Sequence, residues 1–219
     1  MITLDIVKKY PLVKVLMEKA NKNLGEIGYT EHGERHARIV AGTTQYILEQ
    51  LGYDKKTQTM GSVAGFLHDI GNSVNRKSHG QSSAFLTYEI LKDLRASYDE
   101  IAEIMAAVGN HDETDGEPVS PISAAVVIAD KSDVHSSRVR TLKEIDFDIH
   151  DRVNYAVKRS RVLVNRKKKT ITLELHVDTR VSTVMEYFEI FLTRMMASQR
   201  AARILKCEFK LIINKNKLL

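Results

Sequence analysis

The strongest constraint on the fold is the spacing of apolar residues, which changes character near residue 160. Before that point apolar residues recur at three- and four-residue steps, the repeat of an amphipathic helix. In residues 34–51 the apolar residues that share one face are Ile39, Val40, Ile47, Leu48 and Leu51. The repeat predicts seven helices, at Leu4–Asn21, Glu34–Leu51, Thr57–Ile70, His79–Arg95, Asp99–Asn110, Ser120–Val134 and Ile149–Ser160.

After residue 160 the apolar residues alternate with polar ones, which is the period of a half-buried strand. Strands are predicted at Arg161–Asn165, at Thr170–Val177 and around Phe209–Ile213, with a turn at Arg166–Lys169 and a helix at Val181–Leu205. The order β-β-α-β predicts a small sheet backed by one helix. We therefore expect an α+β protein, with an all-α bundle over residues 1–160 and a small basic α+β module over residues 161–219.

Charge is divided unequally between these two parts. Residues 150–219 carry 16 Lys or Arg against 6 Asp or Glu, whereas the whole chain has a net charge of only +5. Such a split is typical of two modules with different tasks, although a basic surface that only favours solubility explains it equally well. The basic turn Arg166–Lys169 favours contact with a nucleic-acid backbone. Homodimer formation or substrate gating through the apolar face of the 181–205 helix is the alternative.

The cysteine content and the hydropathy pattern indicate the compartment. Cys207 is the single cysteine, so an internal disulfide is excluded and a reducing compartment is favoured. No apolar run reaches the roughly 18 residues that a membrane span requires, and the N-terminal residues lack the apolar core of a signal peptide. We expect a cytoplasmic protein without a membrane segment.

Histidines and carboxylates cluster at the ends of the predicted helices in the first part of the chain. His68 and Asp69 end an apolar stretch just before Gly71, and both can reach one metal ion if glycine loosens the last helical turn. Asp130 ends a second apolar run. Burying that carboxylate is costly without a partner, so a cation, a basic side chain or a hydrogen-bond network is implied.

Together these segments resemble the HD-domain phosphohydrolases. His36 with Val40, then GFLHDIGN, SHG, GNHDE and VVIADKSD follow in the family's order over residues 31–135. The resemblance is to those members with the longer ligand set for two metals. It implies six metal ligands, namely His36, His68, Asp69, His79, His111 and Asp130.

The resemblance also implies the role of each ligand. Asp69 would bridge two divalent transition-metal ions (Fe, Mn, Co, Ni or Zn), with His36, His68 and Asp130 on one ion and His79 and His111 on the other. Two adjacent cations lower the pKa of a shared water until hydroxide exists near neutral pH. We therefore expect a phosphomonoesterase or phosphodiesterase that acts on a nucleotide or related phosphate compound.

The sequence departs from the family pattern at one position. Asn72 stands where many members with two metals carry a lysine, and Asn cannot supply positive charge to a phosphate. Arg76 and Lys77 follow in the same loop and are the candidates to replace that lysine. We expect Asp69, Lys77 and Asp133 to be catalytic, with Lys131 as a further candidate for substrate contact and His32 as a residue that orients His36.

Two other functions remain open at this point. Some HD proteins hold a di-iron centre and oxidise small molecules, and they share the same ligand set. Others are non-catalytic modules that sense a nucleotide or RNA. Loss of ligands is the expected signature of the non-catalytic class, and all six ligands are present here.

Overall fold

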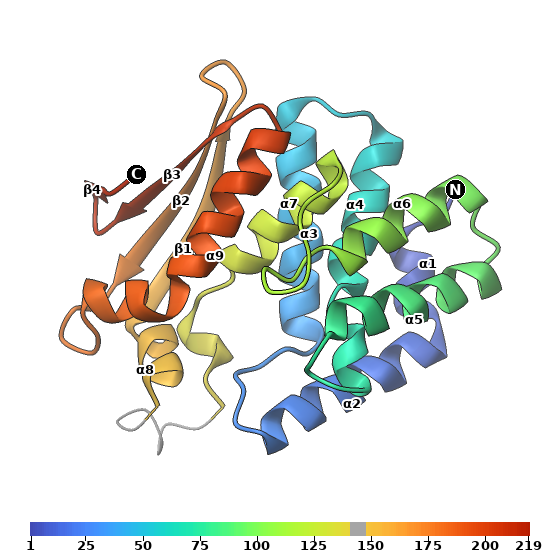
Figure 1. Cartoon of the computed structure of the whole chain (residues 1–219), viewed down its shortest axis with the longest axis horizontal. Helices are drawn as coiled ribbons and strands as arrows, with labels where there is room; N and C mark the ends of the chain where they lie inside the picture. The colour runs from blue at the N-terminus through green and yellow to red at the C-terminus, as the bar shows by residue number, and fades with distance from the viewer. Residues whose placement is uncertain (141–147) are drawn as a thin grey trace.

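The computed structural model describes residues 1–140 and 148–219. Helices form the first part of the chain, and a small sheet with α8 and α9 forms the last part (Figure 1). The first part contains α1 (Leu4–Lys9), α2 (Pro11–Glu26), α3 (Glu34–Leu51), α4 (Lys55–Leu67), η1 (Ile70–Ser73), α5 (His79–Asp93), α6 (Tyr98–Gly109), α7 (Pro121–Ser132) and η2 (Ser136–Arg138). The last part contains α8 (Ile149–Ala156), β1 (Val157–Asn165), β2 (Thr170–Val177), α9 (Val184–Ile204), β3 (Glu208–Ile213) and β4 (Asn216–Lys217). The predicted α+β class is confirmed.

Helices α3, α4 and α7 pack against one another and form the centre of the bundle. Val40, Val63 and Val127 lie at these contacts and are buried. Helix α3 ends where the sequence predicts, because Gly52 adopts a left-handed conformation (φ 86°) in which its N–H bonds back to the helix carbonyls. Helix α3 thus lies at the centre of the bundle, and its first turn carries His36.

The sheet has the strand order β1-β2-β3-β4. Strands β1 and β2 form an antiparallel hairpin, while β2 and β3 run parallel because α9 returns the chain between them. Strand β4 adds a short antiparallel edge. Helix α9 contacts both β3 and α7, so it lies between the sheet and the bundle.

Two of the predicted helices differ most in extent from the structure. The segment predicted as one helix, Leu4–Asn21, is divided at Tyr10, whose backbone is extended, because Pro11 lacks the N–H that a continuous helix needs. The helix predicted at Ile149–Ser160 ends at Ala156, and β1 begins at Val157 rather than Arg161. Pairing with β2 stabilises these residues as a strand, which local periodicity does not reveal.

The two predicted parts share one apolar core among the described residues. Val127 of α7, Phe191 of α9 and Leu173 of β2 all belong to it. The division into residues 1–160 and 161–219 therefore remains a prediction. Among the described helices, none combines the length and the apolar character that crossing a bilayer requires.

Candidate metal centre

Six side chains converge from the ends of five helices. His36 lies in the first turn of α3, His68 and Asp69 follow the last turn of α4, and His79 begins α5. His111 follows α6, and Asp130 lies in the last turn of α7. The structure brings together all six residues that the sequence singled out as ligands, which we call the six-residue cluster. Its four histidines are at most 2% exposed.

Asp69 lies at the middle of the cluster, and its two carboxylate oxygens face different histidines. Oδ2 lies 3.4 Å from His68 Nε2 and 3.7 Å from His36 Nε2. Oδ1 lies 3.1 Å from His79 Nε2 and 3.6 Å from His111 Nε2. One carboxylate therefore joins two separate pairs of imidazoles. Asp130 adds a second carboxylate beside His36 and His68, and its Oδ1 lies 3.2 Å from His36 Nε2.

Gly71 allows this approach. A Cβ at this position would lie 2.3 Å from the backbone oxygen of His79 and 2.4 Å from the backbone nitrogen of Ser83. The Gly71 N–H donates to Ser83 Oγ at 2.8 Å. We expected Gly71 to loosen the last turn of a helix, but its role in the structure is the close packing of two backbones, which places His79 opposite Asp69.

Each histidine of the cluster uses its second ring nitrogen to hold its orientation. The Nδ1 distances are 2.7 Å from His36 to Asp133 Oδ2, 2.8 Å from His68 to the Gly65 carbonyl, 3.1 Å from His79 to the Arg76 carbonyl and 2.7 Å from His111 to the Val108 carbonyl. Carbonyl and carboxylate oxygens accept, so each Nδ1 donates its proton and each Nε2 faces the cluster, where it offers a lone pair to a metal ion when the imidazole is neutral. Such outer contacts fix the tautomer of metal-binding histidines in general.

The spacing of these lone pairs fits the binding of cations. The Nε2 atoms of His36 and His68 are 3.2 Å apart, and those of His79 and His111 are 3.0 Å apart. Two nitrogens that each lie about 2.1 Å from one ion are separated by roughly 3.0–3.4 Å. Without positive charge, paired lone pairs beside two carboxylates would repel one another. Imidazole and carboxylate donors without thiolate suit transition metals such as Fe, Mn, Co, Ni or Zn.

The electrostatics of the cluster indicate the same need for positive charge. Burial raises the pKa of the Asp69 carboxyl, but His68 and the other histidines hold this pKa well below its usual range. Burial lowers the pKa of His68, yet Asp69 and Asp130 raise it to about 10. The carboxylates thus stay ionised and attract a proton or a cation.

Asp133 lies behind the cluster. It accepts from His36 Nδ1 and forms a doubly bonded ion pair with Arg35, at 3.0 and 3.1 Å. Its side chain is only 4% exposed. Burial raises the Asp133 pKa, but the hydrogen bond from His36 brings it below its usual range. Asp133, which was predicted to be catalytic, therefore occupies a supporting position behind His36. His32 was predicted to orient His36, but the two rings meet only in an edge-on contact.

Lys131 places a buried positive charge beside Asp130. Its Nζ lies 2.7 Å from Asp130 Oδ2 and 2.5 Å from Glu113 Oε2. Arg194, on α9, lies 3.5 Å from the same Glu113. This chain of charges links α9 to a residue of the six-residue cluster, and the sequence analysis did not predict it because residues 113 and 194 are far apart along the chain.

The loop before α5 supplies Arg76, not Lys77, to the cluster. Arg76 is half-buried, with Nη1 at 3.2 Å from His79 Nε2 and Nη2 at 3.9 Å from Asp112 Oδ2. Lys77 is exposed, and it forms no ion pair with any residue of the described parts of the chain. Asn72 is buried and donates to Asp69 Oδ1 at 3.0 Å, so it holds a carboxylate at the position where the family lysine stands.

Asp112 is a residue that the sequence analysis missed. Its Oδ2 lies 3.3 Å from His79 Nδ1, and its second oxygen accepts from Thr114. With His79 and His111 it forms one of three groups whose donor atoms lie within 4.8 Å of one another. The signal was present, because His111 and Asp112 repeat the adjacent pair His68 and Asp69.

Comparison with known proteins finds partial relatives of the chain and one matching domain family. An uncharacterized protein of Methanocaldococcus jannaschii is 29% identical over 150 residues, which is 58% of this chain and 57% of that protein. Ribonuclease Y of Desulfotalea psychrophila is 34% identical over 113 residues, 50% of this chain and 20% of that protein, and ribonuclease Y of Bacillus mycoides is 32% identical over the same length and shares. The chain thus spans little more than half of the first relative and about a fifth of the ribonucleases. The HD-domain family model matches residues 33–137, a range that contains the whole six-residue cluster, so these residues form an HD domain.

Proposed function

We propose that this chain is a metal-dependent phosphohydrolase that binds two transition-metal ions and acts on a phosphate ester of a nucleotide or of RNA. The observation that carries the proposal is the position of Asp69, whose two oxygens face two separate histidine pairs. A carboxylate in that position is suited to bridge two ions. The four Nε2 atoms all face the cluster while the Nδ1 atoms are occupied elsewhere, which supports the same proposal.

The residues divide naturally between two ions. We propose that His36, His68 and Asp130 hold one ion, that His79 and His111 hold the other, and that Asp69 serves both. When bound, two such ions supply an activated water and stabilise the charge that develops on phosphoryl oxygens. Asp133 keeps His36 in its orientation, and Asn72 does the same for Asp69.

An anionic substrate is favoured by the basic groups beside the cluster. Arg76 is half-buried and lies within 3.2 Å of His79, where it can donate to a phosphoryl oxygen. The similarity to proteins named ribonuclease Y supports RNA phosphodiesters as the substrate class, and the basic residues of 150–219 agree with it.

A replacement at Asp69 tests the proposal. We expect Asp69→Asn to lower phosphodiesterase activity by more than about a hundredfold, because the loss of an outer contact alone typically costs about 10–100-fold. Protein purified without chelator would be assayed on a chromogenic phosphodiester, a phosphomonoester and a labelled oligoribonucleotide.

Asp115→Asn provides the matched control, since Asp115 is exposed and the charge change is the same. Circular dichroism would show that both variants fold. Asp69→Asn activity close to that of the control, on any substrate that the wild type cleaves, would contradict the proposal.

A further inference from the structure

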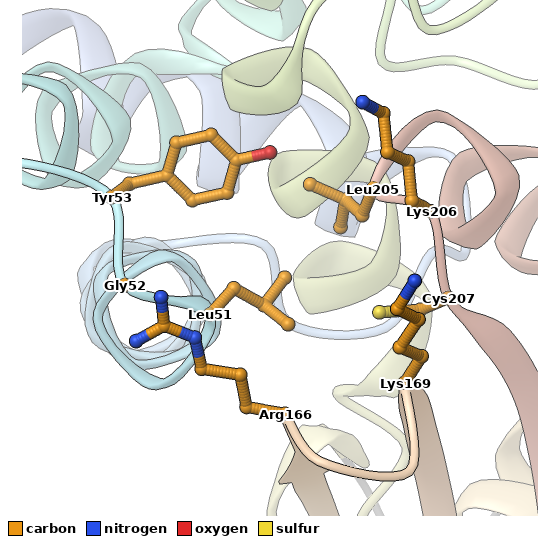
Figure 2. Close-up of a pocket in the computed structure, with 8 residues that line it drawn as sticks. All are labelled: Leu51, Gly52, Tyr53, Arg166, Lys169, Leu205, Lys206 and Cys207. Atoms are coloured by element: carbon orange, nitrogen blue, oxygen red, sulfur yellow. The ribbon is translucent and has the colours of Figure 1, made fainter.

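A second cavity lies at the opposite end of α3 from His36. It has a volume of about 280 Å³ and opens where three segments meet: the end of α3, the turn between β1 and β2, and the connection from α9 to β3. Figure 2 shows the residues that line it, Leu51, Gly52, Tyr53, Arg166, Lys169, Leu205, Lys206 and Cys207. The cavity is therefore built jointly by the bundle and the sheet.

The charge of the cavity lining is entirely positive. Arg166, Lys169 and Lys206 contribute to it, and no Asp or Glu does. None of these three cations forms an ion pair with a carboxylate in residues 1–140 or 148–219, and the nearby Glu208 pairs with Lys210 at 3.2 Å. Three cations without a counter-charge around one cavity create a favourable potential for an anion.

Lys169 and Lys206 have φ values of 51° and 56°, in the left-handed region where glycine or asparagine is least strained. Arg95 and Lys215 have the same kind of backbone and do not line the cavity, so it is the charge and position of the two lysine side chains, and not their backbone conformation, that favour a ligand.

The remaining lining is apolar. Leu205 is buried and Leu51 half-buried, and Tyr53 points its hydroxyl end toward Leu205 (Figure 2). An apolar wall with a cationic rim matches a ligand that has both a flat apolar part and a phosphate. The volume of about 280 Å³ lies just below the range for ligand pockets, which is about 300–1,000 Å³. One nucleotide unit fits this description better than a larger molecule does.

This cavity is separate from the six-residue cluster. His36 and Leu51 are at opposite ends of α3, and a helix rises about 1.5 Å per residue, so they lie roughly 22 Å apart along its axis. A phosphate in the cavity is therefore a different phosphate from one at the cluster.

We propose that the cavity formed by Arg166, Lys169 and Lys206 with Tyr53 binds the phosphate of a nucleotide, either free or as one unit of an RNA strand. The proposal goes beyond the hydrolytic function and needs no metal. Its structural alternative is that the cations only complement the negative C-terminal ends of α3 and α9, which is favourable without any ligand.

Paired lysine variants separate these explanations. Lys169→Gln with Lys206→Gln removes two charges from the cavity, whereas Lys167→Gln with Lys168→Gln removes two charges from the same exposed turn outside it. Glutamine keeps the left-handed positions as strained as lysine does. The parent protein, the cavity variant and the turn variant would all carry Asp69→Asn. Cleavage then does not consume the probe, and any binding at the six-residue cluster is the same in all three.

Binding of AMP and of a labelled short oligoribonucleotide would be measured by calorimetry and fluorescence anisotropy. We expect the cavity variant to bind at least about tenfold more weakly, because hydrogen bonds to charged groups are the stronger class, and the turn variant to change less than about twofold. If the cavity variant binds both AMP and the oligonucleotide more weakly, a free nucleotide is sufficient as the ligand. Weakening for the oligonucleotide alone would identify the strand as the ligand. Equal losses in both variants, or no loss in the cavity variant, would overturn the proposal.

Discussion

At the level of single residues, the six-residue cluster depends on side chains that are not ligands. Asp133 orients His36, Asn72 holds Asp69, and Gly71 permits the backbone contact that places His79. The six residues of the cluster were predictable because they follow the order of the HD-domain pattern, each near a helix end. The supporting contacts were not, since they depend on which atom of a buried group faces which neighbour.

Asp133→Asn tests the supporting role. Both Asp133 oxygens accept from donors, on His36 and Arg35, so either orientation of an amide places its NH₂ group against another donor. We expect metal affinity, measured by chelator competition, to fall by about 10–100-fold. Glu31→Gln removes the other carboxylate near Arg35 and leaves the His36 contact, so its affinity should stay close to wild type. An unchanged affinity in Asp133→Asn would rule out this role.

At the level of elements, segments with two clear ends were predicted with their true bounds. The range of α3 was correct because Gly52 marks its end, and β2 was correct because its alternation is unbroken. The errors arose where local pattern competes with other constraints. Pro11 divides the first helix, and pairing with β2 converts Val157–Ser160 into strand.

The link between α7 and α9 leads to a prediction at this scale. Lys131 is 7% exposed at its side chain and lies between Asp130 and Glu113. Lys131→Met removes the buried cation that lies between the half-buried carboxylates of Asp130 and Glu113, and we expect the free energy of unfolding to fall by up to about 3–5 kcal/mol. Arg194→Gln removes only a half-exposed partner of Glu113 and should cost less than about 1 kcal/mol. Urea unfolding of metal-free protein measures both, and equal effects would show that Lys131 is not the central charge.

At the level of the whole molecule, the sequence correctly predicted a helical bundle with a small sheet. It could not predict that the sheet and α3 together enclose a cationic cavity, because residues 51–53, 166–169 and 205–207 meet only through tertiary packing. The uneven charge of the chain was visible, but its arrangement was not. Two sites at opposite ends of α3 give the molecule a cluster suited to metal-dependent chemistry and a separate cavity suited to an anion.

The count of bound metal ions tests the central claim most directly. Elemental analysis of protein purified without chelator should give close to two transition-metal ions per chain. His79→Ala combined with His111→Ala should give close to one, because His36, His68 and Asp130 remain, and circular dichroism would confirm the fold. One ion per chain in the wild type, with the same count in the double variant, would contradict the two-metal account.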